Sequence, residues 1–315
     1  MMRNLLRSAV LKAVDALPDD GVRHELGKVL SGKRLALCLH RVNTLHRPHD
    51  FFPEMSIAPD KLDALIEFLL SARKGDGRWL TVSFDDGYLD AAEYIRSRAP
   101  RYPELEWIFA ICPEKTKEQA GFRWDRAEQL RERGSEVRIS EVMEAPFELE
   151  RENSALTQVD PRFALAPVEL CRELAGMPNV ALANHTNCHA ELAKLPPELA
   201  SEELRHSHDE FTALFGAPRH FAFPFGIPGV SFTDAHVRQL RELGVETIWS
   251  TEVRPYDQRE RDAGAVLPRV PVWGNRSVRQ IASLIALHAV AANVARGARS
   301  VLTASRTDPT NTVRP

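Results

Sequence analysis

The sequence has 315 residues, of which 43% are hydrophobic and 27% are charged, as in an ordinary folded globular protein. Its formal net charge of −3 gives no electrostatic basis for binding nucleic acid, and it is not acidic enough to indicate disorder. The 4 cysteines are scattered without a CxxC pair, which argues against a disulfide scaffold and favours reduced thiols in a reducing compartment.

The N-terminal segment is basic, and its apolar residues recur at helical spacing rather than in one continuous run. Residues 1–33 are therefore predicted to form a helical extension, and neither a signal peptide nor a transmembrane segment is expected. Such a helix can pack on the protein or lie on an anionic membrane surface, and the pattern leaves both open. We accordingly expect a cytoplasmic protein, with peripheral membrane contact through its terminal helices as the alternative.

From residue 34 onward, short apolar segments alternate with helical patterns, which indicates a parallel sheet that is either a barrel or doubly wound. The predicted strands are 34–42, 79–84, 106–112, 180–184, 220–225, 245–250 and 267–273. The predicted helices between them are 58–72, 89–98, 124–133, 167–175, 197–215 and 233–243.

Two regions depart from this alternation. Residues 134–165 are polar and rich in Glu and Arg, and we interpret them as an insertion that forms either a wall of a substrate cleft or a solvated charged face. Residues 276–302 are predicted to form a C-terminal helix, buried or interfacial but too short to span a membrane. Residues 303–315 are predicted to be a disordered tail.

Two adjacent carboxylates, Asp85 and Asp86, directly follow the apolar strand 79–84 and precede Gly87. In α/β barrels and open sheets, ligands bind at this carboxyl edge of the strands. Successive residues point in different directions there, so one carboxylate can bind a cation while the other acts as a base. Taken alone, the motif can also be an ordinary Asp-Gly turn.

Two histidines, His185 and His189, follow the strand 180–184 with a spacing of four residues. That spacing lets both imidazoles converge on one ion, although a pair of surface or capping histidines is the competing interpretation. Together with Asp86 they would make a site with three protein ligands and open positions, which a hydrolytic zinc centre needs.

A third motif, Phe-Ala-Phe-Pro-Phe-Gly at residues 221–226, combines an apolar strand with a rigid turn. Such a turn can hold a backbone N–H toward a developing oxyanion. A hydrophobic barrel strand that simply ends in a turn is the alternative.

The order and context of these motifs resemble the polysaccharide deacetylase family, the NodB-homology domain, which is a carbohydrate esterase type. The resemblance also includes Leu-His-Arg-Val at 39–42 and Leu-Pro-Arg-Val at 267–270, and it covers residues 35–275. It implies a distorted (β/α) barrel of about seven parallel strands over residues 34–275, with N- and C-terminal helical extensions. 

The resemblance also implies roles for individual residues. Asp85 would be the base, and one divalent metal ion would be bound, zinc first and Co²⁺, Ni²⁺ or Fe²⁺ as alternatives. The backbone N–H of Phe225, after Pro224, would help to bind the oxyanion. The metal ligands implied are Asp86, His185 and His189.

The function implied is that of a metal-dependent hydrolase acting on carbon–nitrogen bonds. Its substrate would be an N-acetyl or O-acetyl group on a sugar, glycan or glycan precursor. One alternative is another amide hydrolase on the same scaffold, such as a deformylase or a cyclic-amide hydrolase. The other alternative is a non-catalytic carbohydrate-binding barrel.

Two positions depart from the family's pattern. Many members carry an Arg two residues before the Pro of the third motif, where this chain has Ala222, and many carry a catalytic-acid His near the end, where it has Arg269. We therefore predict that Arg269 replaces the missing arginine and pairs with Asp85. His40, at the end of the first strand, is our candidate for the acid, with a hydrogen-bonded barrel histidine as the competing interpretation.

Three tryptophans complete the predicted site. Trp124 is expected to border the substrate cleft. Trp249 and Trp273 are expected either to offer a surface on which a sugar stacks or to belong to the barrel core.

Overall fold

The computed structural model describes residues 18–44, 52–73, 75, 78–138, 140, 142 and 160–289. Most of the predicted N-terminal helix, most of the 134–165 insertion, the end of the C-terminal helix and the predicted tail 303–315 lie outside these described residues. The domain bounds given for those segments stay predictions.

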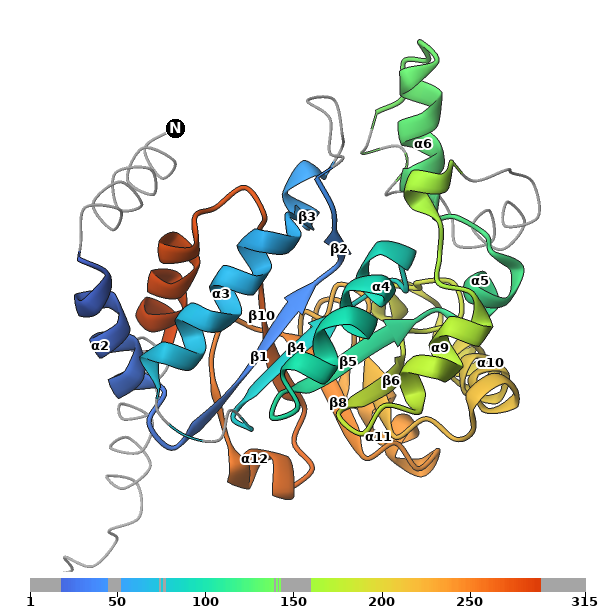
Figure 1. The fold of residues 1–315 in the computed structure, drawn as a ribbon. Helices are drawn as coiled ribbons and strands as arrows, with labels where there is room; N and C mark the ends of the chain where they lie inside the picture. Colours follow the sequence, from blue (N-terminus) through green and yellow to red (C-terminus); the bar gives the residue numbers. More distant parts are fainter. Residues whose placement is uncertain are drawn as a thin grey trace, which may run out of the picture.

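Within the described chain, seven parallel strands close into a barrel (Figure 1). Their order is β10 (Leu267–Pro271), β8 (Thr247–Thr251), β7 (His220–Ala222), β6 (Val180–Asn184), β5 (Glu106–Ile111), β4 (Leu80–Phe84) and β1 (Lys33–Leu39). The barrel closes where Leu37 of β1 pairs with Val270 of β10. The predicted (β/α) barrel is therefore confirmed.

Short strands extend this barrel. The strand β9 (Tyr256–Asp257) pairs antiparallel with the start of β1, and β2 (Arg41–Val42) pairs with β3 (Ser56–Ile57) beyond its end. The 3-10 helices are η1 (Pro53–Met55), η2 (Ala99–Arg101), η4 (Pro161–Phe163) and η5 (Leu192–Lys194).

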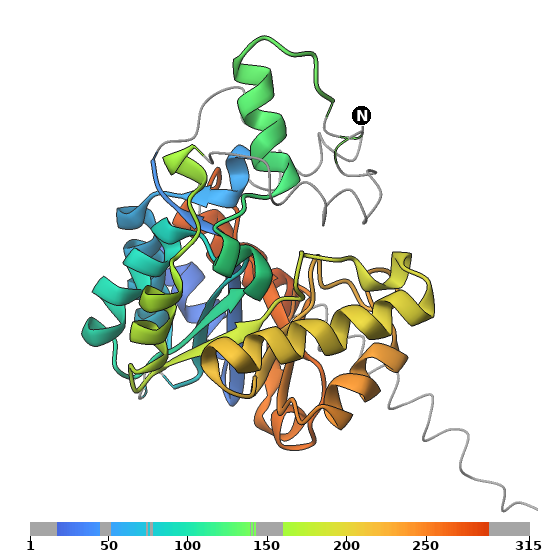
Figure 2. The ribbon, with the colours of Figure 1, turned by 90° about the vertical axis from the view of Figure 1, so that its right-hand side faces the viewer.

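Helices cover the outside of the barrel (Figures 1 and 2). The longer ones are α2 (Asp19–Val29), α3 (Pro59–Ala72), α4 (Leu89–Arg98), α9 (Val168–Ala175), α10 (Pro197–Phe215) and α11 (Asp234–Glu242), and residues 278–289 are also helical. The shorter ones are α5 (Pro113–Glu118) and α12 (Gln258–Asp262). By contrast, α6 (Arg123–Glu132) projects away from the barrel (Figure 2). In the described chain, no helix is both long enough and apolar enough to cross a membrane.

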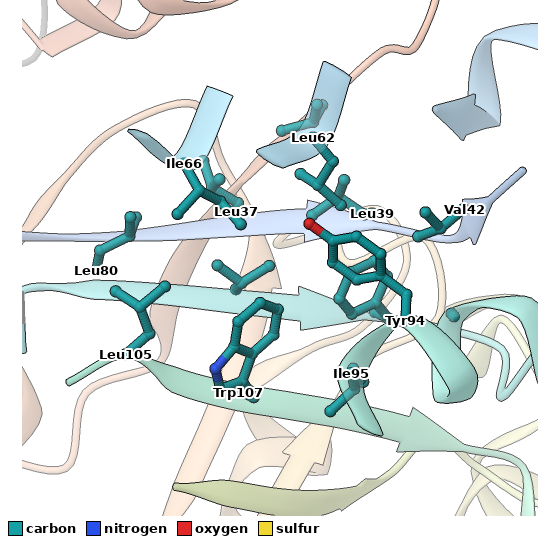
Figure 3. Packing of buried hydrophobic residues seen from close by; sticks show 14 of the residues in the cluster. Leu37, Leu39, Val42, Leu62, Ile66, Leu80, Tyr94, Ile95, Leu105 and Trp107 are labelled. Carbon is teal, nitrogen blue, oxygen red and sulfur yellow. The ribbon is translucent and has the colours of Figure 1, made fainter. Parts of the chain in front are cut away.

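The main core lies between the barrel and its outer helices. Along β1, every second side chain faces outward, so that Leu37 and Leu39 pack beneath Leu62 and Ile66 of α3 (Figure 3). The large ring of Trp107 extends the same core over β5 (Figure 3). Burial of these apolar side chains fixes the position of α3 on the barrel.

The alternate residues of the strands form a separate cluster of buried side chains inside the barrel. Half of its members are small, and they are Ala36, Ala110, Ala183 and Ala222. Trp249 shares this interior and is fully buried, as is Arg269. The small residues leave room for these two large side chains. For Trp249, barrel core is therefore the correct interpretation.

Three strands end two or three residues earlier than the sequence predicts. The strand 34–42 stops at Leu39, the strand 220–225 stops at Ala222, and the strand 267–273 stops at Pro271. After Ala222, Pro224 has no N–H to donate and Phe225 adopts a φ of 59°, so the ladder cannot continue. All three corrections fall at the carboxyl ends of strands, where the chain leaves the sheet.

Candidate metal and catalytic site

The carboxyl ends of β4 and β6 bring Asp86, His185 and His189 together. One ligand atom from each lies within 4.8 Å of the others. The Nε2 atoms of His185 and His189 lie 3.5 Å and 3.3 Å from Asp86 Oδ1. The three side chains are between 1% and 8% exposed, so water competes little for these atoms. The structure thus groups the three predicted ligands.

Surrounding groups orient the two imidazoles. The Nδ1 of His185 donates to the carbonyl oxygen of Ala222 at 2.7 Å, which leaves its Nε2 facing Asp86. The ring of His189 is held edge-on between Trp124 and Phe225, with centroid distances of 4.9 Å and 5.0 Å. A metal-binding histidine is usually oriented by a hydrogen bond to its other ring nitrogen. In His189, packing against these aromatic rings fixes the orientation of the imidazole instead.

These residues fit a divalent cation. Among the described residues, Asp86 Oδ1 is buried without a hydrogen-bond partner. A buried polar atom without a partner is costly, and a cation would satisfy it. Two imidazole nitrogens and one carboxylate oxygen are a donor set typical of catalytic zinc. Burial lowers the pKa of His189 to about 3, so its imidazole is neutral and able to ligate.

Left-handed backbone conformations gather around this cluster. Positive φ angles occur at Asp86 (73°), Thr186 (59°), His189 (62°) and Phe225 (59°). Each costs roughly 1 kcal/mol or more for a residue with a Cβ, and such strain concentrates at functional sites. At Gly226 a glycine is required, because an added Cβ would lie 2.7 Å from the Thr251 backbone nitrogen at a φ of 67°.

Asp85 forms a bidentate ion pair with Arg269 inside the barrel. Its Oδ1 and Oδ2 accept from Nη1 and Nη2 of Arg269 at 2.5 Å and 2.9 Å. The arginine also donates to Ser83 Oγ at 3.1 Å and to the Ser250 carbonyl oxygen at 3.3 Å. Burial favours protonation of Asp85, but Arg269 and His185 outweigh it and hold the pKa of this carboxyl well below its usual range.

This ion pair is the contact predicted from Ala222 and Arg269, the two positions at which the sequence departs from the family's pattern. Ala222 is small and buried in the barrel interior. The side chain of Arg269 is buried there as well and extends to Asp85. The catalytic roles of these residues stay predictions.

A cavity of about 500 Å³ lies over the site. Its lining includes His40, Trp124, Phe225 and Trp273. For Trp273, the cavity therefore favours the interpretation that this side chain offers surface to a ligand. Pro224, by contrast, is not among the described residues that line the cavity. His40 lies just beyond β1, with a buried Nδ1 that has no hydrogen-bond partner among the described residues.

One end of the predicted insertion also reaches the cavity. Phe163 of η4 lines it, and Leu165 forms an isolated bridge with Tyr88. This part of residues 134–165 is therefore a wall of the cleft. The charged middle of the insertion lies outside the described residues.

Sequence reasoning missed a buried network beside His189. The Tyr88 hydroxyl donates to Asp125 at 2.9 Å, and Trp124 Nε1 donates to the Tyr88 hydroxyl at 2.9 Å. The backbone N–H of Phe122 donates to Asp125 at 3.1 Å and so caps the start of α6. The network aims the indole of Trp124 at His189. Its only signal in the sequence is that Tyr88 directly follows the first motif and Asp125 directly follows Trp124.

This network predicts a pH dependence of stability. Burial raises the pKa of Asp125 from 3.8 to about 7. Folded protein therefore keeps this proton when the unfolded chain has lost it, so the free energy of unfolding falls as pH rises between these values. In Asp125→Asn that loss should disappear. The stability of the variant relative to the unmodified protein should rise by up to about 4 kcal/mol between about pH 4 and pH 8.

Urea denaturation of the metal-free proteins at a series of pH values measures this difference. Parallel stability curves for the two proteins would contradict a raised pKa at Asp125.

Comparisons with known proteins bear on the same region. The family model for polysaccharide deacetylases matches residues 152–248. No curated protein matches the chain by sequence. Among solved structures, the chain is similar to a putative polysaccharide deacetylase from Bacillus anthracis, with 16% identity, a TM-score of 0.53, and coverage of 80% of this chain and 69% of that one.

Two smaller deacetylases show the same likeness over nearly their whole length. A deacetylase of Streptococcus pyogenes, solved with acetate, has 13% identity and a TM-score of 0.54, over 80% of this chain and 98% of its own. A de-N-acetylase of Aggregatibacter actinomycetemcomitans has 14% identity and a TM-score of 0.55, over 80% of this chain and 99% of its own. At such identities these structures establish a shared fold.

The segment matched by the family model contains His185 and His189 and the third motif, residues 221–226. The shared fold extends the likeness across the remaining strands. The match of the family model and the shared barrel fold both support the resemblance to polysaccharide deacetylases that the motifs carry.

Proposed function

We propose that the chain is a metal-dependent deacetylase that removes an N-acetyl or O-acetyl group from a sugar, glycan or glycan precursor. The observation that carries this proposal is the buried cluster of Asp86, His185 and His189 beside a second carboxylate, Asp85, that Arg269 keeps ionised. One carboxylate is thereby free for proton transfer while the other ligates.

Each residue has a defined task in the reaction. A divalent cation held by Asp86, His185 and His189, most simply zinc, would polarise the acetyl carbonyl and acidify a neighbouring water. Asp85 takes the proton of the water that attacks the carbonyl carbon. 

Two further groups complete the reaction. The backbone N–H of Phe225 donates to the oxygen that becomes negatively charged. His40 then protonates the leaving nitrogen or oxygen. The carbon–heteroatom bond breaks, and acetate and a free amine or hydroxyl are released.

Acetate release by the metal-loaded protein tests the proposal. The substrates are acetylated monosaccharides, nucleotide sugars and oligosaccharides, and Asp85→Asn serves as the inactive control. We expect Asp85→Asn to bind metal normally and to lose about 10²- to 10⁴-fold in kcat, the usual contribution of a general base. Release of formate or opening of a cyclic amide instead would favour the other amide hydrolases. A protein unable to bind zinc would favour a non-catalytic barrel.

The variant His40→Ala tests the acid. Protonation of the leaving group matters for a poor leaving group such as an amine and hardly at all for a phenolate. We therefore expect His40→Ala to lose about 10²- to 10⁴-fold on an N-acetyl sugar and almost nothing on an aryl acetate, with metal content unchanged. Equal losses on both substrates, or full activity on both, would remove His40 from this role.

A further inference from the structure

The rim of the cavity has two chemically different halves. Because the strands follow the order β10-β8-β7-β6-β5-β4-β1 around a closed barrel, segments after β4, β5 and β6 share one half of the rim. This half supplies every acidic side chain of the described lining and two of its three histidines, namely Asp85, Asp86, Asp125, Glu128, His185 and His189. It is the half where a polar acetylated group would be processed.

The other half is apolar. Phe225 and Ile227 follow β7, Val253 follows β8, and Trp273 follows β10. Met55, which precedes β3, joins the same lining. Among the described lining residues, the segments after β7, β8 and β10 contribute no Asp, Glu, Lys or Arg side chain. Thr251, at the end of β8, and Ser56, beside Met55, add hydroxyl groups to this lining, so a ligand group lying there would meet mostly carbon atoms.

The apolar half is also open to the outside. Ile227 lines the cavity and is nevertheless 48% exposed. Apolar surface held open at the mouth of a pocket marks a place where an apolar ligand group gains by leaving water. 

The kind of apolar surface matters. Sugar rings stack on flat aromatic side chains and need polar partners for their hydroxyl groups. Phe225 and Trp273 provide flat rings on this side, whereas Met55, Ile227 and Val253 are aliphatic and offer neither a flat ring nor a polar partner. They suit an alkyl or acyl chain better than a second sugar unit.

We propose that the substrate is amphiphilic, with the acetylated sugar at the metal cluster and an alkyl or acyl chain along the side formed after β7, β8 and β10. This inference rests on the proposed deacetylase function and names its substrate class. A nucleotide is the poorer occupant, because its phosphates require cations. Among described lining residues the arginine is Arg41, on the β1 side, and Asp90 already pairs with it at 3.0 Å.

A chain-length series tests the inference. The probes are methyl, butyl and octyl N-acetylglucosaminides, used below the concentration at which they form micelles. Burial of one methylene contributes at most about a fourfold gain in binding. We expect kcat/KM for acetate release to rise by about tenfold or more from the methyl to the octyl glycoside, since several methylenes would be buried.

Two residues of one turn provide a matched pair of variants. Ile227 and Val230 are both aliphatic and exposed, and the backbone N–H of Val230 donates to the Ile227 carbonyl oxygen at 3.1 Å. Only Ile227 of this pair lines the cavity. Ile227→Asn is expected to bring the octyl-to-methyl ratio of kcat/KM toward one, whereas Val230→Asn should leave that ratio unchanged.

The outcomes separate this inference from the proposed function. Turnover of the methyl glycoside with no dependence on chain length would overturn the inference and leave the deacetylase standing. Calorimetric titration of the same glycosides into Asp85→Asn measures binding without turnover. Binding that tightens with chain length while the unmodified protein releases no acetate would support the apolar subsite and count against the deacetylase. Binding that is equal for all chains would overturn the inference independently of activity.

Discussion

The variant His185→Ala is expected to lose its metal and to lose kcat/KM by about 10³-fold or more, the scale of a Lewis-acid contribution of several kcal/mol. His185 supplies one of three ligand atoms, and its Nε2 is fixed by the bond from Nδ1 to the Ala222 carbonyl oxygen. Two remaining ligands, Asp86 and His189, make too few bonds to hold a cation tightly. Elemental analysis after dialysis and acetate release measure both effects.

A second histidine of the barrel provides the control. His220 begins β7, so it lies at the opposite end of the strand from the metal cluster. Its ring stacks on that of Trp249, with 6.4 Å between the ring centroids. His220→Ala should retain metal and activity. If it loses both, the loss in His185→Ala reflects damage to the barrel, and full metal content in His185→Ala would refute the assigned ligand set.

Much of the fold could be predicted because its strands and helices carry strong local patterns. The predicted bounds of β6, α4 and α10 agree with the structure at both ends. The strand β9 escaped prediction because it has two residues, and a distant contact stabilises it. That contact is the ion pair between Lys33 and Asp257, whose Nζ and Oδ1 are 2.5 Å apart. Such pairing depends on how the barrel closes, which no local pattern encodes.

The candidate site likewise contains some residues that local sequence patterns predict and others that they do not. Asp86 and the two histidines could be found because each follows an apolar strand, and parallel strands present their carboxyl ends at one edge. The bond between Tyr88 and Asp125 joins residues 37 positions apart, with α4, β5 and α5 between them in the sequence. Each residue directly follows a residue or motif of the predicted site, but nothing in the sequence specifies the contact between the two. Long-range polar networks of this kind become visible only once the strands are arranged.

Arg269→Ala is expected to impair turnover by about 10²- to 10⁴-fold with metal content intact, because the base then loses its orientation. It should also lower the free energy of unfolding by about 3–5 kcal/mol, since Asp85 would be left as a buried carboxylate without its partner. Burial raises the pKa of Asp85 once the arginine is gone, so activity should fall at a higher pH on the acid side than in the unmodified protein. Acetate release across pH measures this shift.

Lost stability alone cannot produce that pH shift, and two further variants separate the effects. Arg261 forms a bidentate pair with Glu106 at the start of β5, with distances of 2.8 Å and 2.6 Å, away from the cavity. Arg261→Ala should lose stability while keeping both activity and its pH profile. Arg269→Lys keeps a positive charge but loses the two parallel bonds, so partial activity with a smaller shift is expected. An Arg269→Ala protein with full activity would show that Asp85 needs no partner to act as the base.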